Sequence, residues 1–446
     1  MAPICGYLGK DAKAKAVKML LASKYQGNRK IWENQGMAIA QISPEIESPG
    51  FALDGSFYEG DIDINTNINI IKSLDNFKDS LQRVNGDYAL ATIKEGKLLI
   101  ARDPVGVKPL YYGFDTTEFA FASEKAMLRA LAIKDIKTLT PGSILIYDEE
   151  IEIIEERIFE QATLIQDEKQ AFELLKKALN RAIEIRLRKL KNAGILFSGG
   201  IDSSLLAFKI PSAKLYVTGI AGSHDLEQAR LSARALGMED KLRVVEIKLD
   251  EIEAQIPEVI NIIENSSPMQ VELGLALSFA MQAMKKEGIL VAVSGQGSDE
   301  LFAGYRRYTD ILNKQGEAAL QSELFKNIKN IARENLERDV AIANANSLEL
   351  IMPFLDKDLI NLVLSFDPKL KIKVCENGKG GIAKYILRKV AEEFIPREIA
   401  WRDKKSMQYG SGMHVALKTI ARKNGFSGKM GVERYLACIE EGVKKW

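Results

Sequence analysis

The residues best suited to chemistry directly follow a short apolar strand. The run SGGIDSS comes after AGILF at residues 193–197 and precedes an apolar helix. Small residues let the backbone approach a phosphate, and the start of a helix presents free N–H groups and a positive dipole end to an anion. A tight turn with a capping Asp or Ser is the alternative. The polar cluster lies where open α/β sheets bind ligands, which favours a phosphate loop formed by Ser198, Gly199, Gly200, Asp202, Ser203 and Ser204.

A second apolar strand ends in a similar polar run. ILVAV at residues 289–293 leads into Ser294, Gly295 and Gln296, and Asp299 follows three residues later. Two such ends in one parallel sheet are expected to form one site. Asp202 and Asp299 are then expected to share Mg²⁺, which proteins hold with one or two carboxylates and substrate phosphates. A carboxylate that only stabilises a helix N-terminus is the alternative for Asp299.

The elements that must position these loops change in character near residues 150 to 170. Before this point, short β-type runs alternate with Gly, Pro and Asp turn signals, which is typical of antiparallel sheets. After it, long amphipathic helices separate short apolar strands, which indicates a parallel sheet covered on both faces. We expect an α+β sandwich over residues 1–158, then a doubly wound α/β domain over 166–446 that becomes helical from about residue 305. The expected parallel strands are AGILFS, LYVTGI, LRVVEIKL and GILVAVSG.

Composition narrows the function further. The 446 residues carry 62 basic and 61 acidic side chains, a net charge of +1, so no single-sign field would recruit nucleic acid or an anionic membrane. No stretch approaches the ~20 apolar residues that span a bilayer. The three cysteines and two histidines show no metal-ligand spacing. We expect a cytoplasmic protein with small-molecule partners, and a homodimer is the candidate assembly.

Both loops resemble those of a known family. SGGIDSS resembles the pyrophosphate-binding loop of the N-type ATP pyrophosphatases, and SGQGSDELFAGY resembles the second signature of asparagine synthetases. MPFLD, KGGIAKYILRKV and WRDKKSMQYGSG follow in the order of that family. In the first domain, CGYLG, VNGDYALATI, ARDPVGVKPLYYG and FASEKAML resemble the class II glutamine amidotransferase domain, which implies an Ntn-hydrolase-like sandwich.

The resemblance implies a reaction and a set of roles. A carboxylate attacks the α-phosphorus of ATP, pyrophosphate leaves on Mg²⁺, and ammonia displaces AMP to form an amide. By the same matching, Lys404 would stabilise the departing pyrophosphate, and Leu196, Phe197 and Thr218 would contact the nucleotide. Lys384 and Arg388, one helical turn apart, are weaker candidates for phosphate contacts, and a solvated basic face is the alternative.

The first domain departs from the family where glutamine would be hydrolysed. The nucleophile of the family is an N-terminal cysteine whose own amine is the base, whereas Cys5 follows four residues. The Asn-Gly-Glu segment that builds the oxyanion hole corresponds to Asp54, Gly55 and Ser56, and an anionic Asp54 would repel an oxyanion. The arginine that grips the glutamine carboxylate is not recognisable, and Asn65 to Asn67 replace a Ser-Asp pair. We therefore expect no glutamine hydrolysis unless residues 1–4 are removed, and a buried role for Cys5.

The second domain departs in two places. Gln296 stands where asparagine synthetases have Glu and β-lactam synthetases have Tyr, so it can hydrogen-bond ammonia but cannot accept its proton. The helix before the second loop lacks the expected arginine and supplies Glu272, which suits a cationic or amine-bearing substrate. Pairing of Glu272 with a basic residue from elsewhere is the alternative.

Three functions fit these observations. The first is an asparagine synthetase that uses ATP, Mg²⁺, aspartate and ammonia or, weakly, glutamine. The second is another adenylating ligase, such as a β-lactam synthetase, for which Gln296 and Glu272 argue. The third is a non-catalytic binding or scaffolding relative, and the presence of Asp202, Asp299 and Lys404 argues against it.

Overall fold

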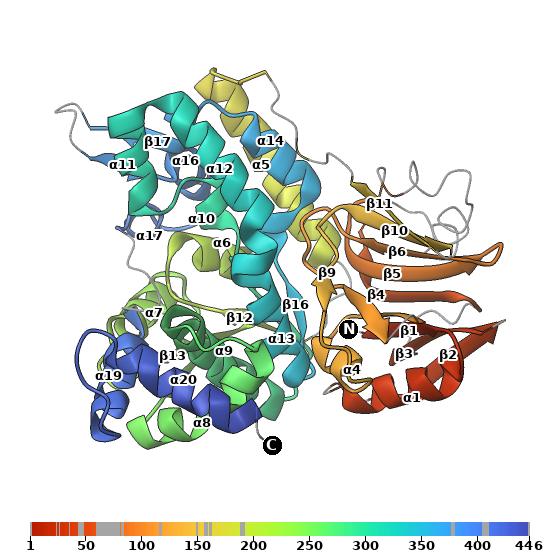
Figure 1. Ribbon diagram of the computed structural model, residues 1–446. Helices are drawn as coiled ribbons and strands as arrows, with labels where there is room; N and C mark the ends of the chain where they lie inside the picture. The colour runs from red at the N-terminus through yellow and green to blue at the C-terminus, as the bar shows by residue number, and fades with distance from the viewer. Residues whose placement is uncertain are drawn as a thin grey trace. The chain divides into compact units, whose positions relative to one another are not determined.

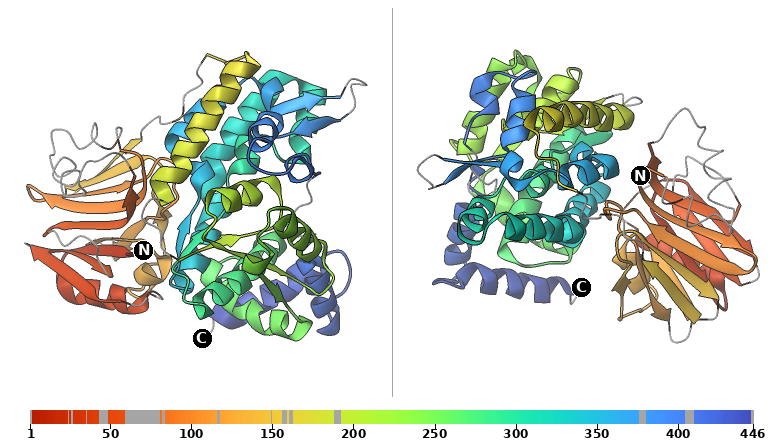
Figure 2. Two further views of the ribbon diagram at one scale, coloured as in Figure 1. Left: turned by 180° about the vertical axis from the view of Figure 1, so that it is seen from behind. Right: turned by 90° about the horizontal axis from the view of Figure 1, so that it is seen from above.

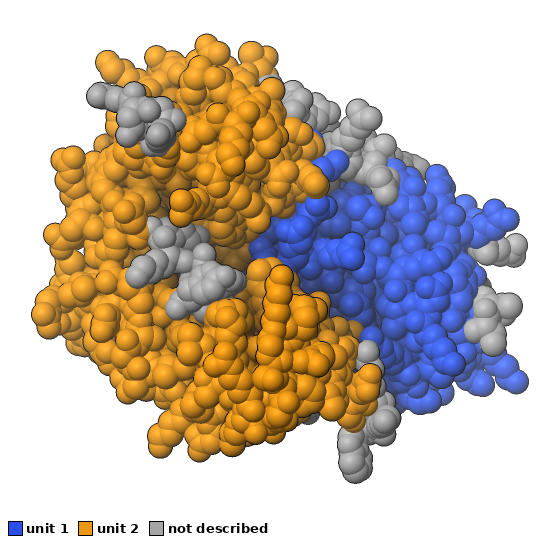
Figure 3. Space-filling view, turned by 60° about the vertical axis from the view of Figure 1, so that its left-hand side comes forward, with its two compact units in different colours: residues 1–161, 329–340, 356–361 blue, residues 162–328, 341–355, 362–446 orange. Residues whose placement is uncertain are grey.

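The computed structural model describes most of the chain and divides it into two compact units. The described residues are 2–23, 25, 27–34, 36–42, 49–58, 81, 84–115, 118–148, 150–155, 159, 163–187, 192–375, 380–403 and 410–444. The first unit comprises residues 1–161 with segments 329–340 and 356–361, and the second comprises 162–328, 341–355 and 362–446 (Figure 3). The ribbon is labelled by element in Figure 1.

The first unit contains two antiparallel sheets. One has the strand order β2-β3-β1-β8-β7-β9 and the other β11-β10-β6-β5-β4. The first sheet comprises β1 Ile4–Leu8, β2 Arg29–Asn34, β3 Met37–Ile42, β7 Tyr111–Asp115, β8 Glu118–Ala122 and β9 Lys137–Thr138. The second comprises β4 Phe51–Phe57, β5 Gly86–Lys94, β6 Lys97–Arg102, β10 Ser143–Asp148 and β11 Glu150–Glu155. The α+β sandwich expected from the sequence is confirmed.

The sheets of this unit lie face to face (Figure 2), because apolar side chains alternate toward a shared interior. Ile39 and Phe121 of the first sheet pack with Ala91 and Ile100 of the second in one buried cluster. The opposite face of the first sheet is covered by α1 Ala12–Ala22 and α4 Lys125–Arg129, which bury Met19 and Met127 against it. The central strands β1, β3 and β8 thus have both faces buried.

The second unit is built on a five-stranded parallel sheet in the order β14-β13-β12-β15-β16. Its strands are β12 Ala193–Leu196, β13 Lys214–Gly219, β14 Leu242–Glu246, β15 Val291–Val293 and β16 Glu349–Ile351. The four strands expected from the sequence are the first four of these, so the doubly wound sheet is confirmed. The carboxyl ends of β12 and β15, which are neighbours, carry the two polar runs.

Helices make up much of the described chain beyond residue 162. Their bounds are α5 Glu168–Leu187, α6 Ile201–Lys209, α7 His224–Ala235, η2 Glu239–Lys241, α8 Leu249–Ile263, α9 Pro268–Lys286, α10 Ser298–Leu301, α11 Arg306–Gln315, α12 Glu317–Ile331, a π-helical η3 Ala332–Leu336, α13 Glu337–Ala345, η4 Pro353–Leu355, α14 Lys357–Leu364, α15 Pro368–Lys371, α16 Tyr385–Ala391, α17 Arg397–Ala400, α19 Met413–Lys423 and α20 Gly431–Lys444. Helices α8, α9, α19 and α20 share one apolar core. None of the helices within the described residues is long and apolar enough to cross a bilayer.

The C-terminal part is less uniformly helical than expected. Besides β16, a hairpin of β17 Ile372–Val374 and β18 Gly381–Ala383 lies in the region where the sequence indicated helices alone. Each of these strands has three residues, too few to show an alternation of apolar and polar positions. The expectation of continuous helix beyond residue 305 is therefore wrong at these three strands.

Candidate active site

The SGGIDSS loop joins the end of β12 to the start of α6 in a strained turn. Gly199 has φ +71°, and a Cβ there would lie 2.6 Å from the Gln228 carbonyl oxygen, so only glycine fits. Ser203 Oγ donates to the Gly200 carbonyl oxygen at 3.3 Å, and the Gly200 N–H lies 3.3 Å from Ser198 Oγ. The loop is thus shaped by its own serines, and α6 begins directly after it.

Two side chains from elsewhere hold the carbonyl oxygen of Gly199. Ser232 Oγ, on α7, donates to it at 2.8 Å, and Arg402 Nη1 donates to it at 3.3 Å. Arg402 Nη1 also lies 2.7 Å from Ser232 Oγ. Because both donors bind this carbonyl oxygen, they fix the orientation of the peptide between Gly199 and Gly200. Sequence reasoning missed Ser232 and Arg402.

The two aspartates expected to hold Mg²⁺ lie together, with an ammonium group between them. Lys384 Nζ is 2.6 Å from Asp202 Oδ2 and 2.7 Å from Asp299 Oδ1. Ser298 Oγ donates to Asp202 Oδ1 at 2.6 Å and lies 3.1 Å from Lys384 Nζ. The aspartate side chains are each 19% exposed, whereas that of Lys384 is 2% exposed. One buried cation therefore bridges two partly exposed carboxylates and balances one of their two negative charges.

Lys384 is placed by an unusual backbone. Its φ of 57° lies in the left-handed region, which costs a non-glycine residue of order 1–3 kcal/mol. Burial alone would lower the pKa of Lys384, but the Asp202 and Asp299 carboxylates raise it. A Cβ at Gly304 would overlap Asp299 Oδ1 and crowd Lys384 Cε, so glycine is needed where this backbone approaches the cluster.

Arg388 is also buried, so the solvated basic face considered for Lys384 and Arg388 is wrong. Its Nε donates to the Ala383 carbonyl oxygen at 2.7 Å, and its Nη1 donates to the carbonyl oxygens of Ala400 at 2.7 Å and Arg402 at 2.9 Å. These bonds tie the guanidinium to three backbone carbonyl groups. Arg388 thus fixes the backbone of the residue whose side chain holds the phosphate loop.

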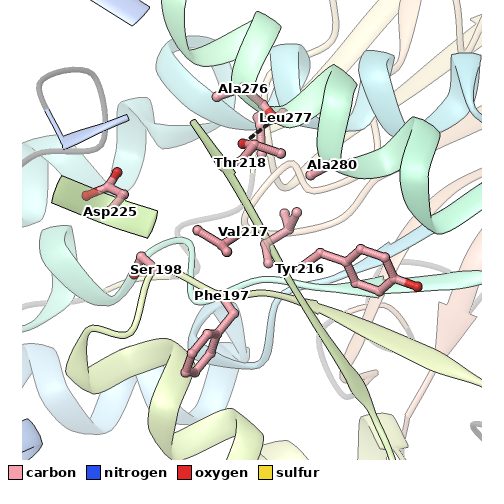
Figure 4. A pocket seen from close by; sticks show the side chains of 10 residues that line it. Phe197, Ser198, Tyr216, Val217, Thr218, Asp225, Ala276, Leu277 and Ala280 are labelled. Carbon is pink, nitrogen blue, oxygen red and sulfur yellow. Dashed lines mark hydrogen bonds between the residues drawn. The ribbon is translucent and has the colours of Figure 1, made fainter. Parts of the chain in front are cut away.

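An apolar pocket opens beside the loop. Together with the solvent space at its mouth, the pocket has a volume of about 360 Å³. It is lined by Leu196, Phe197, Ser198, Tyr216, Val217, Thr218, Asp225, Ala276, Leu277 and Ala280 (Figure 4). Leu196, Phe197 and Thr218 are the residues that the family resemblance assigned to the nucleotide. Thr218 Oγ1 donates to the Ala276 carbonyl oxygen at 3.0 Å, which ties β13 to α9. Its hydroxyl proton is therefore engaged, while its methyl group and the lone pairs of Oγ1 can still contact a ligand.

Glu272 is buried one turn before this lining. Its Oε1 lies 2.7 Å from His414 Nδ1 on α19, and its side chain is 3% exposed. Burial raises the pKa of Glu272, and His414 opposes the shift. A basic partner from elsewhere in the chain was the alternative to substrate binding, and this geometry matches that alternative.

The structure describes only some of the remaining residues predicted for this site. Lys404 lies outside the described residues, which end at 403 and resume at 410. Gln296 follows β15, and its backbone N–H donates to Ser294 Oγ at 3.2 Å. A Cβ on Gly295 would lie 2.9 Å from Asp202 Cβ, so the two loops touch at this glycine.

The cluster fits a magnesium ion. Asp202 and Asp299 already direct one oxygen each at a single cation, the Lys384 ammonium. Within the described ranges, no group of three or more Asp, Glu, His or Cys side chains converges on a metal position. Mg²⁺ does not need one, because it is normally held by one or two carboxylates, substrate phosphates and water.

In the first unit, Cys5 is buried rather than poised as a nucleophile. It has no exposed surface, and burial together with the nearby Glu124 carboxylate raises the pKa of its thiol. Residues 2–4 in front of it are bonded into the sheet: the Ile42 N–H donates to the Pro3 carbonyl oxygen at 3.1 Å, and the Ile4 N–H to Ser123 Oγ at 3.1 Å. The expected buried role of Cys5 matches this placement.

Asp54, at the expected oxyanion position, is buried as well. Asp54 Oδ1 lies 3.8 Å from Lys108 Nζ and accepts a hydrogen bond from the Ala2 N–H at 3.4 Å. Gly55 has φ +119°, and a Cβ there would overlap the Asp87 carbonyl oxygen. The carboxylate is thus paired inside the unit. Asn65, Thr66 and Asn67 lie outside the described residues.

Comparison with known proteins identifies the family of this chain. The family model described as asparagine synthase matches residues 174–320 and 312–437, and one described as a glutamine amidotransferase domain matches residues 52–130. A protein named putative asparagine synthetase [glutamine-hydrolyzing] 1 from Methanocaldococcus jannaschii is 35% identical over 418 residues, covering 82% of this chain and 76% of its own length. This chain belongs to the asparagine synthetase family.

Other members of the asparagine synthetase family are longer. Asparagine synthetase B [glutamine-hydrolyzing] from Escherichia coli is 27% identical, and the match covers 75% of this chain but 62% of that protein. The solved structure of glutamine phosphoribosylpyrophosphate amidotransferase from B. subtilis has 14% identity and a TM-score of 0.31, with 50% of this chain and 67% of that chain covered. That likeness is too slight to carry an argument. Family membership rests on the sequence matches.

Proposed function

We propose that this protein is an ATP-dependent ligase that adenylates aspartate and transfers ammonia to it, giving asparagine, AMP and pyrophosphate. The observation that carries the proposal is the convergence of Asp202 and Asp299 on one cation position beside the SGGIDSS loop. Membership in the asparagine synthetase family supports the choice of aspartate and disfavours the other adenylating ligases. ATP and Mg²⁺ are the nucleotide and metal that this donor set suits.

The residues of the second unit divide the work as follows. The N–H groups at the start of α6, with Ser198, Ser203 and Ser204, bind the β- and γ-phosphates, and Leu196, Phe197 and Thr218 line the nucleotide pocket. Asp202 and Asp299 would hold Mg²⁺, which would supply positive charge to the pyrophosphate group. Lys384 and Lys404 provide further positive charge to the phosphates.

Gln296 would receive the incoming amine. It leaves the end of β15 beside Gly295, where the two loops touch. Its amide can orient ammonia through its carbonyl oxygen, while the proton lost on amide formation passes to solvent or phosphate. Ammonia reaches the site largely as ammonium at neutral pH, so the rate should rise with pH until deprotonation is complete.

We propose that ammonia, rather than glutamine, is the principal nitrogen source. The support lies in the first unit, where the Cys5 thiol is buried with a raised pKa and residues 2–4 are part of the sheet. A free α-amine on Cys5 would require loss of these residues and their hydrogen bonds. The side chain of Asp54, at the expected oxyanion position, is paired with Lys108 and has no N–H to donate.

The proposal is tested by following AMP and asparagine in the presence of Mg-ATP and aspartate. Ammonium should support both products in equal amounts, and glutamine should give little of either. Formation of ADP instead of AMP, or AMP only with a carboxylate other than aspartate, would refute the assignment. A cytoplasmic location and a homodimer also stay proposals, tested by cell fractionation and by light scattering of the purified protein.

A further inference from the structure

The position of Lys384 raises a question about the metal site that the proposed function does not answer. The two carboxylates proposed to bind Mg²⁺ are already bound to the Lys384 ammonium, at 2.6 and 2.7 Å. An ammonium and a magnesium ion cannot occupy the same point between two oxygens. In this structure both proposed metal ligands are therefore engaged by Lys384.

We propose that Lys384 is an internal counter-ion that keeps Asp202 and Asp299 closed to free Mg²⁺ until a nucleotide binds. The phosphates of the nucleotide then take over the ammonium, and the released carboxylates accept the metal. This inference rests on the proposed function, because it assumes that the site takes a magnesium-bound triphosphate. It adds an order of events: nucleotide binding opens the metal site.

Charge balance supports the exchange. Without Lys384, two carboxylates would face each other across one buried position, and their repulsion would be large where the solvent is largely excluded. Without a carboxylate or phosphate partner, the ammonium, which is 2% exposed, would be a buried charge with no ionic partner. Lys384 stays protonated throughout, and only its anionic partner changes.

The local geometry gives the ammonium a short path to the phosphates. Asp202 lies in the first turn of α6, directly after the loop proposed to bind the phosphates. The carboxylate of Asp202 and the proposed phosphates therefore lie at the same edge of the sheet. The contact of Lys384 Nζ with Ser298 Oγ, 3.1 Å, belongs to the second loop. Rotation about the four-carbon side chain suffices, while the backbone of Lys384 stays at its left-handed position before α16.

The first test measures Mn²⁺ binding to the nucleotide-free protein by electron paramagnetic resonance. Lys384→Gln should bind Mn²⁺ at least about tenfold more tightly than the unmodified protein, because it frees two carboxylates. A second substitution, Asp299→Asn, should remove this gain and so place the metal at the carboxylates. The control is Lys389→Gln, which removes a lysine of α16 that pairs with Glu168 outside the site. This variant should bind Mn²⁺ as the unmodified protein does.

The second test needs no change at Lys384 and stands if that variant does not fold. In the nucleotide-free protein, Asp299→Asn should leave Mn²⁺ affinity unchanged, because the carboxylates do not serve the metal in that state. With β,γ-methylene-ATP present, Asp299→Asn should weaken Mn²⁺ binding at least about tenfold. This binding is measured by the enhancement of water-proton relaxation that protein-bound Mn²⁺ causes.

Tight Mn²⁺ binding by the nucleotide-free protein that Asp299→Asn abolishes would overturn the inference. So would a Lys384→Gln protein that folds and binds Mn²⁺ no better than the Lys389→Gln control. These readouts require no turnover. A protein that passes them but forms no AMP from aspartate would keep the role of Lys384 and lose the proposed substrate.

Discussion

The two predicted sites of this chain differ in how far their paired charged side chains are exposed. In the first unit, Asp54 and Lys108 pair with each other, and their side chains are 2% and 4% exposed. In the second unit, Asp202 and Asp299 also pair with a lysine, but each carboxylate is 19% exposed and stands beside a phosphate-type loop. An accessible ion pair can exchange partners more readily than an enclosed one. Under the proposed function, this contrast distinguishes the nucleotide site of the second unit from a first unit that no longer hydrolyses glutamine.

The largest effect is expected at the accessible carboxylates. Asp202→Asn and Asp299→Asn should each lower the rate of AMP formation by about 1,000-fold or more, because the metal would lose a charged ligand. Asp250→Asn, at an exposed position of α8, serves as the control and should keep the full rate. A near-normal rate in either site variant, with unfolding temperatures matched, would break the contrast in favour of a structural role in both units.

A second prediction concerns a buried lysine away from both sites. Lys371 has no exposed surface, and burial lowers its pKa to about 7 from an ordinary value of 10.5. The unfolded chain then binds more protons than the folded one between pH 7 and 10, so stability rises with pH in that window. Relative to Lys371→Met, the unfolding free energy should climb by about 1.4 kcal/mol per pH unit.

Urea titrations of both proteins at pH 7, 8 and 9 measure this slope. Turnover with ammonium at pH 8 should be the same in the two proteins, because Lys371 neutralises no site carboxylate. Parallel stability curves would mean that the ammonium finds an anionic partner. A loss of turnover would extend the working site to α15.

A third prediction concerns the clamp on the phosphate loop. Arg402→Ala should lower kcat/KM for ATP by about 10- to 100-fold, because the Gly199 carbonyl would lose one of its donors and the loop its fixed orientation. Arg402→Lys should recover part of the loss, and Arg397→Ala, at an 80% exposed side chain of the same region, should lose nothing. Hydrogen exchange of residues 197–206 should accelerate only in Arg402→Ala. Unchanged exchange there would rule out the clamp.

The smallest effect is expected at the enclosed site. Cys5→Ala should leave ammonia-dependent AMP formation unchanged and destabilise the first unit by about 1 kcal/mol, the cost of a small buried group. Glutamine titrations of the two proteins make the comparison direct. Glutamine-dependent asparagine formation that disappears in Cys5→Ala would show that the first unit also works.

The parts of this account that the sequence could predict are local. AGILFS and GILVAVSG are short apolar runs followed by small polar residues, and both became neighbouring parallel strands with loops at their carboxyl ends. The meeting of Asp202 and Asp299 follows from that arrangement. Their role toward Mg²⁺ remains a proposal.

The parts that could not be predicted depend on long-range contacts. Lys384 lies 182 residues from Asp202, and His414 lies 142 residues from Glu272. A partner at such separations leaves no periodic pattern in the sequence, so the sequence predicts neither of these two ion pairs. Ser232, in the interior of α7, carried no signal because a helical serine usually contacts solvent or its own helix.

The most direct test of the central claim is the release of pyrophosphate from Mg-ATP by the purified protein with aspartate, comparing ammonium with glutamine as nitrogen source. The account predicts pyrophosphate, AMP and asparagine in equal amounts with ammonium, little product with glutamine, and no change on Cys5→Ala. Equal or greater product with glutamine, abolished by Cys5→Ala, would contradict the assignment of the first unit. Absence of pyrophosphate with aspartate under any condition would contradict the assignment of the second.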